Sequence, residues 1–360
     1  MKKSKPRKDY IDIAKCIGII CVVCGHCGIA KQFVYQFHMP LFVFLSGYLY
    51  NSIHNEKCSN AGKYFLSKIK TIYLPFVGYE LFFLLIHNPL VKINFINELS
   101  NNSYFSLKET VVDAVKILTM GYGETMAGAL WYLIALFEVV IIATILLFIG
   151  NVLDKKVKKG LGIVFVAIMV IGLYAISFRF SLPRNLNKAL ILLVFYMIGV
   201  VFKKAENHVK YGRYIFIPLI IVPIIISINN WNESWNSNKT IALAFISALT
   251  GILSIYQLSI LLGEYLPKFF KKAVCYIGKN SMGILVFHFL MFGIVKLVYV
   301  YSNGLDPKLI GKFPVLDGGV GLKIAYLVVG VGGSLVVYAL IQRLKKLITI
   351  SYKNKKSKDE

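Results

Sequence analysis

The chain has 360 residues, of which 57% are hydrophobic and 16% are charged, and its mean hydropathy is +0.66. A water-soluble domain carries roughly a quarter charged residues, so this composition excludes a single globular core and favours a protein that crosses a membrane many times. The same composition excludes a disordered chain, and 6 cysteines are too few for a secreted scaffold built from disulfides.

The net charge of +24 comes from 41 Lys and Arg against 17 Asp and Glu. In a membrane protein such basic residues set the orientation in the bilayer and contact anionic lipid. The aromatic residues lie within apolar runs rather than between basic residues, so the pattern typical of nucleic-acid binding is missing. We therefore expect membrane lipid as a partner and no nucleic acid.

A membrane-spanning helix needs about 20 mainly apolar residues. Ten runs of the sequence fit this requirement, although Pro75 and Glu80 interrupt the third. The sequence therefore predicts an all-α, polytopic membrane protein with about ten transmembrane helices, a single membrane domain over residues 1–350 and a basic tail over 351–360. The predicted spans are residues 11–30, 33–53, 71–87, 127–149, 160–178, 187–203, 213–230, 240–262, 280–301 and 320–342.

The loops between these spans indicate the orientation. With the N-terminus in the cytoplasm, the inner segments hold 28 Lys and Arg and the outer segments hold 10. This bias follows the positive-inside rule and places both termini in the cytoplasm. The basic N-terminus resembles a signal peptide, but Asp9, Asp12 and Lys15 begin the apolar run and no small-residue cleavage site follows. We therefore expect an uncleaved first helix.

The longest outer segment, residues 88–126, contains a stretch in which polar and apolar residues alternate with helical spacing, SLKETVVDAVKILTM. This spacing predicts a helix that lies on the membrane surface.

Three ionisable residues, Asp12, Lys15 and His26, fall in or near the first span. At about 100° per residue all three lie on one helix face, with Lys15 and His26 about 16 Å apart along the axis. Ionisable side chains inside a membrane are costly and usually functional. For Asp12 and Lys15 a second interpretation stays open, in which they pair or extend to the membrane interface.

The second span begins with FHMPLFVFLSG, which places His38 at the depth of His26 in a neighbouring antiparallel helix. Histidine is the side chain best suited to accept a proton near neutral pH, although two imidazoles can also bond to each other for structural reasons. Ser46 adds a hydroxyl one or two turns deeper. In the ninth span His288 follows Ser281 by seven residues, so both face the same way near the middle of the membrane.

The remaining histidines, His54, His87 and His208, are interpreted as ordinary surface residues. Cys24 and Cys27 flank His26 with a spacing that also occurs in metal sites. No second cysteine pair accompanies them, and small residues favour close helix packing in lipid. The sequence therefore favours a structural use of these cysteines and predicts no metal site.

Several motifs resemble one known family. RKDYIDIAKCIGIICVVCGH followed by FHMPLFVFLSGYLY resembles the start of the acyltransferase 3 superfamily, and most of all its fucose 4-O-acetylase-like branch. The resemblance continues in order along the chain. The further matching segments are KIKTIYLPF, ALWYLIALF, SLPRNLNKALILLVFYMIGVVF and YIGKNSMGILVFH.

This resemblance implies that residues 1–350 form a membrane acyltransferase domain, in a multi-pass protein of a bacterial cell membrane. It implies transfer of an acetyl group from cytoplasmic acetyl-CoA to a hydroxyl of an extracytoplasmic glycan or a lipid-linked sugar, with no permanently bound cofactor. The family's first-span histidine maps to His26. Lys15 stands where many members carry arginine, and it keeps the charge but not the two-pronged hydrogen bonding of a guanidinium.

On this basis we expect His26 to be the general base, with His38 and Asp12 also catalytic. Whether His26 first takes the acetyl group itself stays open. Lys15 and His288 would line a channel for the pantetheine arm of acetyl-CoA. The phosphates would bind basic side chains near helix ends, which otherwise only follow the positive-inside rule. These side chains are Lys68, Lys70 and Lys279.

The expected acceptor contacts are Ser46, Ser281, Trp131 and Tyr132. The two aromatic residues would stack on a sugar ring or belong to the aromatic belt of the membrane interface. Two rival functions are a transporter or flippase for a lipid-linked glycan and a structural subunit of an assembly. The absence of visible inverted repeats with broken helices disfavours transport. The sequence leaves the oligomeric state open.

Overall fold

The computed structural model describes residues 9–51, 57–97, 104–121, 123–183, 186–206, 212, 214–229 and 238–359. Within these ranges every regular element is a helix, which confirms the all-α prediction. The helices are α1 (Asp9–His26), α2 (Lys31–Val34), α3 (His38–Tyr48), α4 (Cys58–Lys68), the π-helical turn η2 (Ile69–Tyr73), α5 (Leu74–Lys92), α6 (Leu107–Leu118), the 3-10 helix η4 (Thr125–Leu130), α7 (Trp131–Lys156), α8 (Leu161–Arg179), α9 (Leu186–Ala205), α10 (Phe216–Ile228), α11 (Asn238–Tyr265), α12 (Lys268–Lys279), α13 (Ser281–Ser302), the 3-10 helix η6 (Pro307–Gly311) and α14 (Val320–Asp359).

Seven helical stretches in the described residues are long and apolar enough to cross a membrane, which confirms a protein with multiple membrane helices. They are Ser59–Lys92, Thr125–Lys156, Leu161–Arg179, Leu186–Ala205, Ile241–Tyr265, Ser281–Ser302 and Val320–Leu347. The other three predicted spans coincide with shorter or more polar helices. The 18-residue α1 contains Asp9, Asp12 and Lys15, and α10 has 13 residues. The count of ten spans and the cytoplasmic termini stay predictions.

The expected second span is not one continuous helix. Helix α2 ends at Val34 and the 11-residue α3 begins at His38. The side chain of Gln36 holds this break in place, because its Nε2 donates to the carbonyls of Gln32 at 2.9 Å and Pro223 at 3.1 Å. Pro40 lies in the first turn of α3, where a missing backbone N–H costs nothing. The break leaves the residues between the two helices beside the end of α1.

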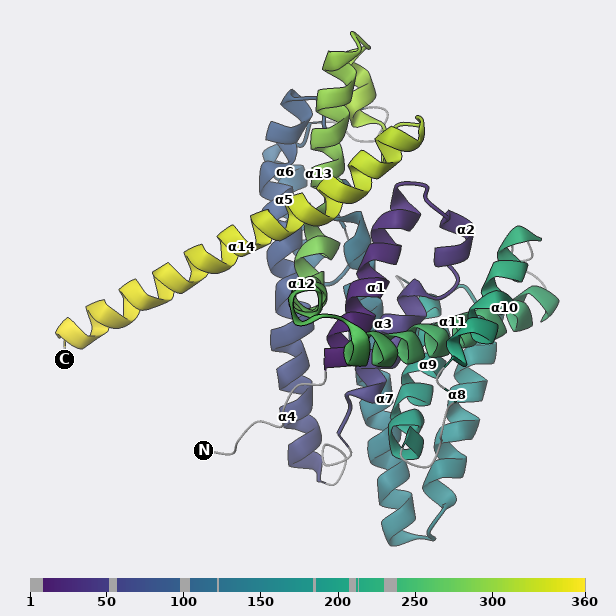
Figure 1. Ribbon diagram of the computed structural model, residues 1–360. Coiled ribbons are helices and arrows are strands. Elements are labelled where there is room, and N and C mark those ends of the chain that lie inside the picture. The colour runs from purple at the N-terminus through teal and green to yellow at the C-terminus, as the bar shows by residue number, and fades with distance from the viewer. Residues whose placement is uncertain are drawn as a thin grey trace.

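Helix α1 lies at the centre of the molecule, with α13, α14 and the α4–α5 column on one side and α3, α9, α10 and α11 on the other (Figure 1). Glycines permit very close contacts between helices. Gly278 of α12 packs directly against the main chain of Asp12, and α3 and α9 meet through Gly47 and Gly199, each against the partner's main chain. Small residues at such crossings are typical of helix packing in lipid.

Helix α6 confirms that the stretch after residue 105 is helical. Ser106 and Glu109 close its N-terminus with reciprocal hydrogen bonds, which satisfy otherwise unpaired N–H groups. Leu107, Val111 and Val115 are more than half exposed and lie on one face. An exposed apolar stripe supports, as a prediction, a helix that rests on the membrane surface.

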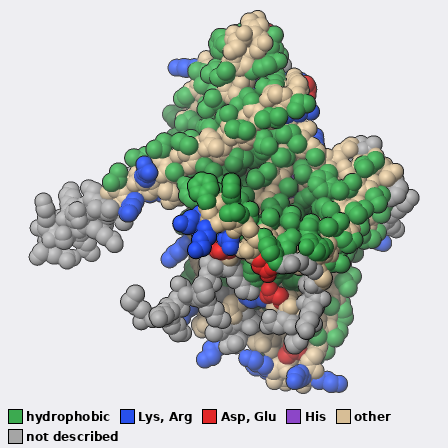
Figure 2. Space-filling view, viewed as in Figure 1, with side chains coloured by type: hydrophobic (Ala, Val, Ile, Leu, Met, Phe, Trp, Pro, Cys, Tyr) green, Lys and Arg blue, Asp and Glu red, His purple; other side chains and the backbone are tan. Residues whose placement is uncertain are grey.

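Lys and Arg side chains gather along the lower edge of the molecule, below the ends of α7 and α8, whereas hydrophobic side chains cover much of the middle and upper part of this face (Figure 2). The lower edge includes the end of α7 with Lys155 and Lys156. This distribution agrees with the orientation predicted from the loops.

Cysteine labelling tests that orientation. We expect Lys158→Cys, in the turn between α7 and α8, to react with an impermeant maleimide only after the cells are permeabilised, and Lys108→Cys, exposed in α6, to react in intact cells. The parent chain, with its 6 native cysteines, measures the background. Labelling of Lys158→Cys in intact cells would overturn the predicted topology.

Candidate active site

The end of α1 is built so that three aromatic side chains meet there. Gly28 and Ala30 have positive φ angles of 75° and 47°, and this turn sends the chain back along α1. The hydroxyl of Tyr35 then lies 3.2 Å from Nδ1 of His26, and the Tyr35 ring lies 5.1 Å from the ring of His38. Tyr35 therefore connects the two histidines that the sequence placed in one layer.

His288 completes this histidine cluster, which consists of His26, Tyr35, His38 and His288. The His288 ring is fully buried and stacks on the His26 ring, with centroids 5.3 Å apart and planes 29° apart. Its Nδ1 lies 2.9 Å from the carbonyl oxygen of Ile284 and 3.0 Å from that of Leu285, so Nδ1 carries the hydrogen and donates. In a neutral imidazole Nε2 then holds the lone pair.

That Nε2 atom is buried and has no hydrogen-bond partner among the described residues. Buried polar atoms in native structures usually have a partner, so this acceptor beside His26 makes the cluster a candidate functional site. His38 is arranged in the same way, because its Nδ1 donates to the carbonyl oxygen of Val34 at 2.7 Å. Both rings are thus fixed by the main chain.

A cavity of about 540 Å³ opens beside the cluster, and we call it the histidine cavity. His26 and His38 line it, but His288 does not. Its volume lies in the usual range of small-molecule sites, roughly 300–1,000 Å³. The side chains on its wall that carry polar groups are His26, Tyr35, Gln36, His38, Trp131 and Lys188.

A second cavity of about 170 Å³, which we call the lysine cavity, lies deeper along α1. Four residues singled out from the sequence line it, namely Lys15, Ser46, Tyr132 and Ser281. The two cavities share Val22, Met39 and Leu285 in their walls. Lys15 and His26 therefore line two neighbouring cavities that are separated by these three apolar side chains.

Trp131 and Tyr132, expected to act together, line different cavities. Consecutive helical residues point about 100° apart, so Trp131 faces the histidine cavity and Tyr132 does not. Tyr132 is buried, and the centroid of its ring lies 6.1 Å from that of Phe42. The ammonium of Lys188 lies 4.2 Å from the centroid of the Trp131 ring. The two rings therefore do not face one common cavity, and only Trp131 lines the histidine cavity.

The structure does not bring Asp12 to the histidines. Asp12 is fully buried, its carboxylate lies 3.9 Å from the ammonium of Lys279, and it precedes His26 by about 21 Å along α1. Lys279 was one of three expected phosphate contacts. Of the other two, Lys68 has its ammonium 4.9 Å from the centroid of the Tyr64 ring, and Lys70 is exposed in η2. None of these side chains lines either cavity.

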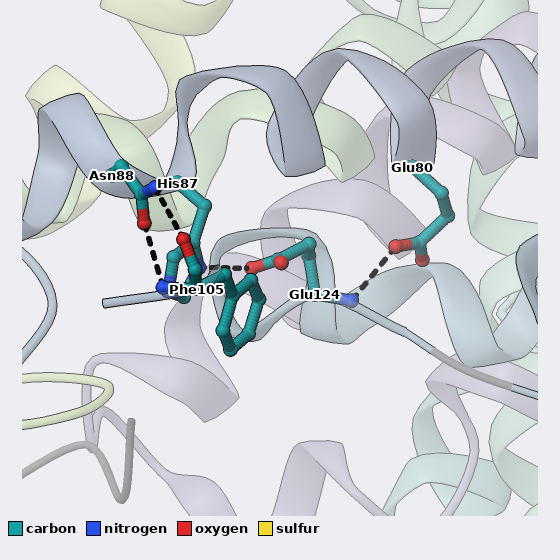
Figure 3. A network of polar contacts seen from close by, with 5 residues as sticks. All are labelled: Glu80, His87, Asn88, Phe105 and Glu124. Atoms are coloured by element: carbon teal, nitrogen blue, oxygen red, sulfur yellow. Dashed lines mark hydrogen bonds and ion pairs between the residues drawn. The ribbon is translucent and has the colours of Figure 1, made fainter. Parts of the chain in front are cut away.

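The expectation that His87 is an ordinary surface residue is wrong. His87 and Glu124 are each 1% exposed, and His87 Nδ1 lies 3.1 Å from the Glu124 carboxylate (Figure 3). The backbone N–H of Glu124 donates to Glu80 at 2.8 Å, and the His87 ring stacks on Phe105 at 3.7 Å. This network ties α5 to the segment that leads into η4 and Trp131. His54 and His208 lie outside the described residues.

Sequence reasoning missed Tyr35, Gln36 and Lys188 as parts of the site. The available signal was the polar pair of Tyr35 and Gln36 in the otherwise apolar run FVYQFH. Within the described ranges, no group of three or more His, Cys, Asp or Glu side chains could hold a metal ion. Cys27 Sγ donates to the carbonyl of Cys24 at 3.4 Å, a local helix-end contact.

The fold and the site define a helical membrane protein in which a cluster of imidazoles lies beside two neighbouring cavities. A family model described as an acyltransferase domain, Acyl_transf_3, matches residues 8–343. The chain therefore belongs to the acyltransferase 3 superfamily and is a membrane acyltransferase. The likeness to the fucose 4-O-acetylase branch stays a prediction. Neither the curated proteins nor the solved structures include a match to this chain.

The buried network of Glu80, His87 and Glu124 generates a stability prediction. We expect Glu124→Ala to lower the free energy of unfolding by about 1–3 kcal/mol, because it removes the carboxylate that faces His87 in a buried site. Adding His87→Phe should restore part of that loss, since both polar partners are then gone. The thermal unfolding midpoint in detergent measures both effects, with exposed Lys108→Ala as a control. An unchanged midpoint for Glu124→Ala would contradict this role.

Proposed function

We propose that the protein transfers an acetyl group from cytoplasmic acetyl-CoA to a hydroxyl of a glycan or lipid-linked sugar on the other side of a bacterial cell membrane. The observation that carries the proposal is the meeting of the lysine cavity and the histidine cavity at Val22, Met39 and Leu285. A donor and an acceptor that enter from opposite sides can meet at such a junction.

The donor side of the proposal begins at the lysine cavity. Acetyl-CoA is a polyanion with a long, mostly uncharged arm, and the predicted cytoplasmic segments are rich in Lys. The ammonium of Lys15 and the hydroxyls of Ser46 and Ser281 give the lysine cavity groups that can bond to the polar parts of the arm. The expectation that Lys68, Lys70 and Lys279 contact the phosphates continues as part of this proposal.

The acceptor side is the histidine cavity, where His26 is the only histidine of the stacked pair that reaches the wall. In the proposed step His26 takes the proton of the acceptor hydroxyl while the hydroxyl oxygen attacks the acetyl carbonyl carbon. The carbon–sulfur bond breaks and the CoA thiolate leaves. The proton that His26 received then passes to the leaving sulfur, so the products are the acetyl ester and CoA.

His38 and His288 have different proposed parts. His38 lines the same cavity and is held by the Val34 carbonyl, so it can bond to the acceptor without moving. His288 packs behind His26 and fixes the position of its ring. Because the chain belongs to an acyltransferase family, the enzyme is favoured over the transporter and the assembly subunit.

Replacing the general base tests this function. We expect His26→Ala to accumulate in the membrane and bind acetyl-CoA like the parent protein, but to lose acetyl transfer by about 10²–10⁴-fold, which is typical of general-base removal. His38→Ala should lose less, because it orients the acceptor rather than taking its proton. The measurement is the acetyl-ester content of cell-surface glycan, alongside protein abundance.

The control for this test is the total amount of glycan. An enzyme predicts unchanged polymer without acetyl esters, whereas a flippase predicts loss of the polymer itself. Normal acetylation by His26→Ala at normal abundance would refute the proposed mechanism.

A further inference from the structure

We infer that the acceptor carries an anionic group, a carboxylate or a phosphate, and that Lys188 binds it at the wall of the histidine cavity with Lys31 nearby. This inference rests on the proposed function, because it names the chemical class of the acceptor at the same site.

The position of Lys188 is the first observation. It is the third residue of α9, it is exposed, and it lines the histidine cavity. Its ammonium lies over the ring of Trp131, 4.2 Å from the ring centroid. None of the ion pairs within the described residues includes Lys188. The charge is therefore held at the cavity by an aromatic ring and is not neutralised by a carboxylate there.

Helix stability does not explain this lysine. The N-terminal turn of a helix carries a partial positive charge, so a cation there is disfavoured. Membrane orientation does not explain Lys188 either. Lys188 belongs to a predicted outer segment, and such segments hold only 10 of the Lys and Arg because basic residues favour the cytoplasmic side. A charge that neither the helix nor the topology favours is accounted for by a ligand of opposite charge.

Lys31 supplies a second, similar observation: it does not line the histidine cavity itself, but it lies against Tyr35, which does. Its ammonium lies 5.7 Å from the centroid of the Tyr35 ring, and the Tyr35 hydroxyl bonds to His26. Lys31 also takes part in no ion pair within the described residues. Two ammonium groups thus lie against two aromatic rings that line one cavity.

Among the residues that the structure describes, no acidic side chain lines the histidine cavity. The buried carboxylates Glu80 and Glu124 are already engaged with the main chain and with His87. A cleft lined by charge of one sign concentrates ligands of the opposite sign. The histidine cavity therefore suits a sugar whose reacting hydroxyl lies near a carboxylate or a phosphate, with His26 at the hydroxyl and Lys188 at the anion.

Matched acceptors test the inference directly. Methyl glucuronide and methyl glucoside differ only at C6, where a carboxylate replaces the hydroxymethyl group, and glucose 1-phosphate supplies a phosphate. We expect the purified protein to bind at least one anionic probe about tenfold more tightly than the glucoside, as judged by quenching of tryptophan fluorescence, and the preference to weaken with salt. A preference for the glucuronide would indicate a sugar acid as the acceptor, and a preference for glucose 1-phosphate would indicate a sugar phosphate.

Variants of Lys188 test whether this side chain causes the preference for anionic probes. We expect Lys188→Gln to lose most of the preference for the anionic probe, while its affinity for the glucoside stays within about twofold of that of the parent protein. Lys188→Arg should keep the preference, because it keeps the positive charge. Exposed Lys308, in η6, provides the matched control Lys308→Gln, which should behave like the parent protein. Lys31→Gln should reduce the preference less, because Lys188 lines the histidine cavity and Lys31 does not.

Equal affinity for the neutral and anionic probes, no binding of either anionic probe, or an unchanged preference in Lys188→Gln would overturn the inference. Release of CoA thiol from acetyl-CoA is measured in the same samples. An anionic preference that depends on Lys188, without any His26-dependent CoA release, would contradict the proposed function and leave the anion site in place.

Discussion

The histidine cluster depends on two hydrogen bonds from imidazole to main chain. His38 and His288 each donate from Nδ1 to a carbonyl four residues earlier, at 2.7 and 2.9 Å. A donor that is satisfied in this way fixes both the tautomer and the direction of the ring. The bond from His38 to Val34 also spans the break between α2 and α3. The same interaction therefore shapes the chain and sets the chemistry of the cluster.

The break has a second consequence for the site. Had residues 33–53 formed one straight helix, Tyr35 and His38 would point in directions set only by helical periodicity. Instead, with the turn at Gly28 and Ala30 and the anchoring of Gln36 to Pro223, the Tyr35 ring lies against His26 and the His38 ring lies against Tyr35. Residues of this short, irregular connection, Tyr35 and Gln36, line the histidine cavity.

Periodicity along single helices predicted which of the site's side chains share a face, but it did not predict that Ser46 and Ser281, expected at the acceptor, line the same cavity as Lys15. Lys15, Ser46 and Ser281 line the lysine cavity, and His26 and His38 line the histidine cavity, as faces of helices. Such predictions succeed because the direction of a side chain in a helix follows from its sequence position. The all-helical membrane fold followed in the same way from apolar runs of sufficient length.

What the sequence did not reveal depends on contacts between distant segments. His87 looked like a surface histidine because its partner Glu124 follows 37 residues later in another segment. Lys188 carried no signal in the sequence, because its contact with Trp131 joins two different helices. Asp12 shares a helix face with Lys15, yet α12 approaches it through Gly278 and supplies Lys279 as its partner. No local pattern contains that information.

In the proposed mechanism the donor and the acceptor meet where the lysine and histidine cavities adjoin. Replacing Leu285 probes this junction, because Leu285 lines both cavities and the bulky indole of Leu285→Trp would separate them. We expect Leu285→Trp to accumulate normally and bind acetyl-CoA but to transfer no acetyl group, whereas Leu285→Met, which nearly conserves volume, should remain active. Acetyl transfer by Leu285→Trp at the parent rate would show that donor and acceptor do not meet at this junction.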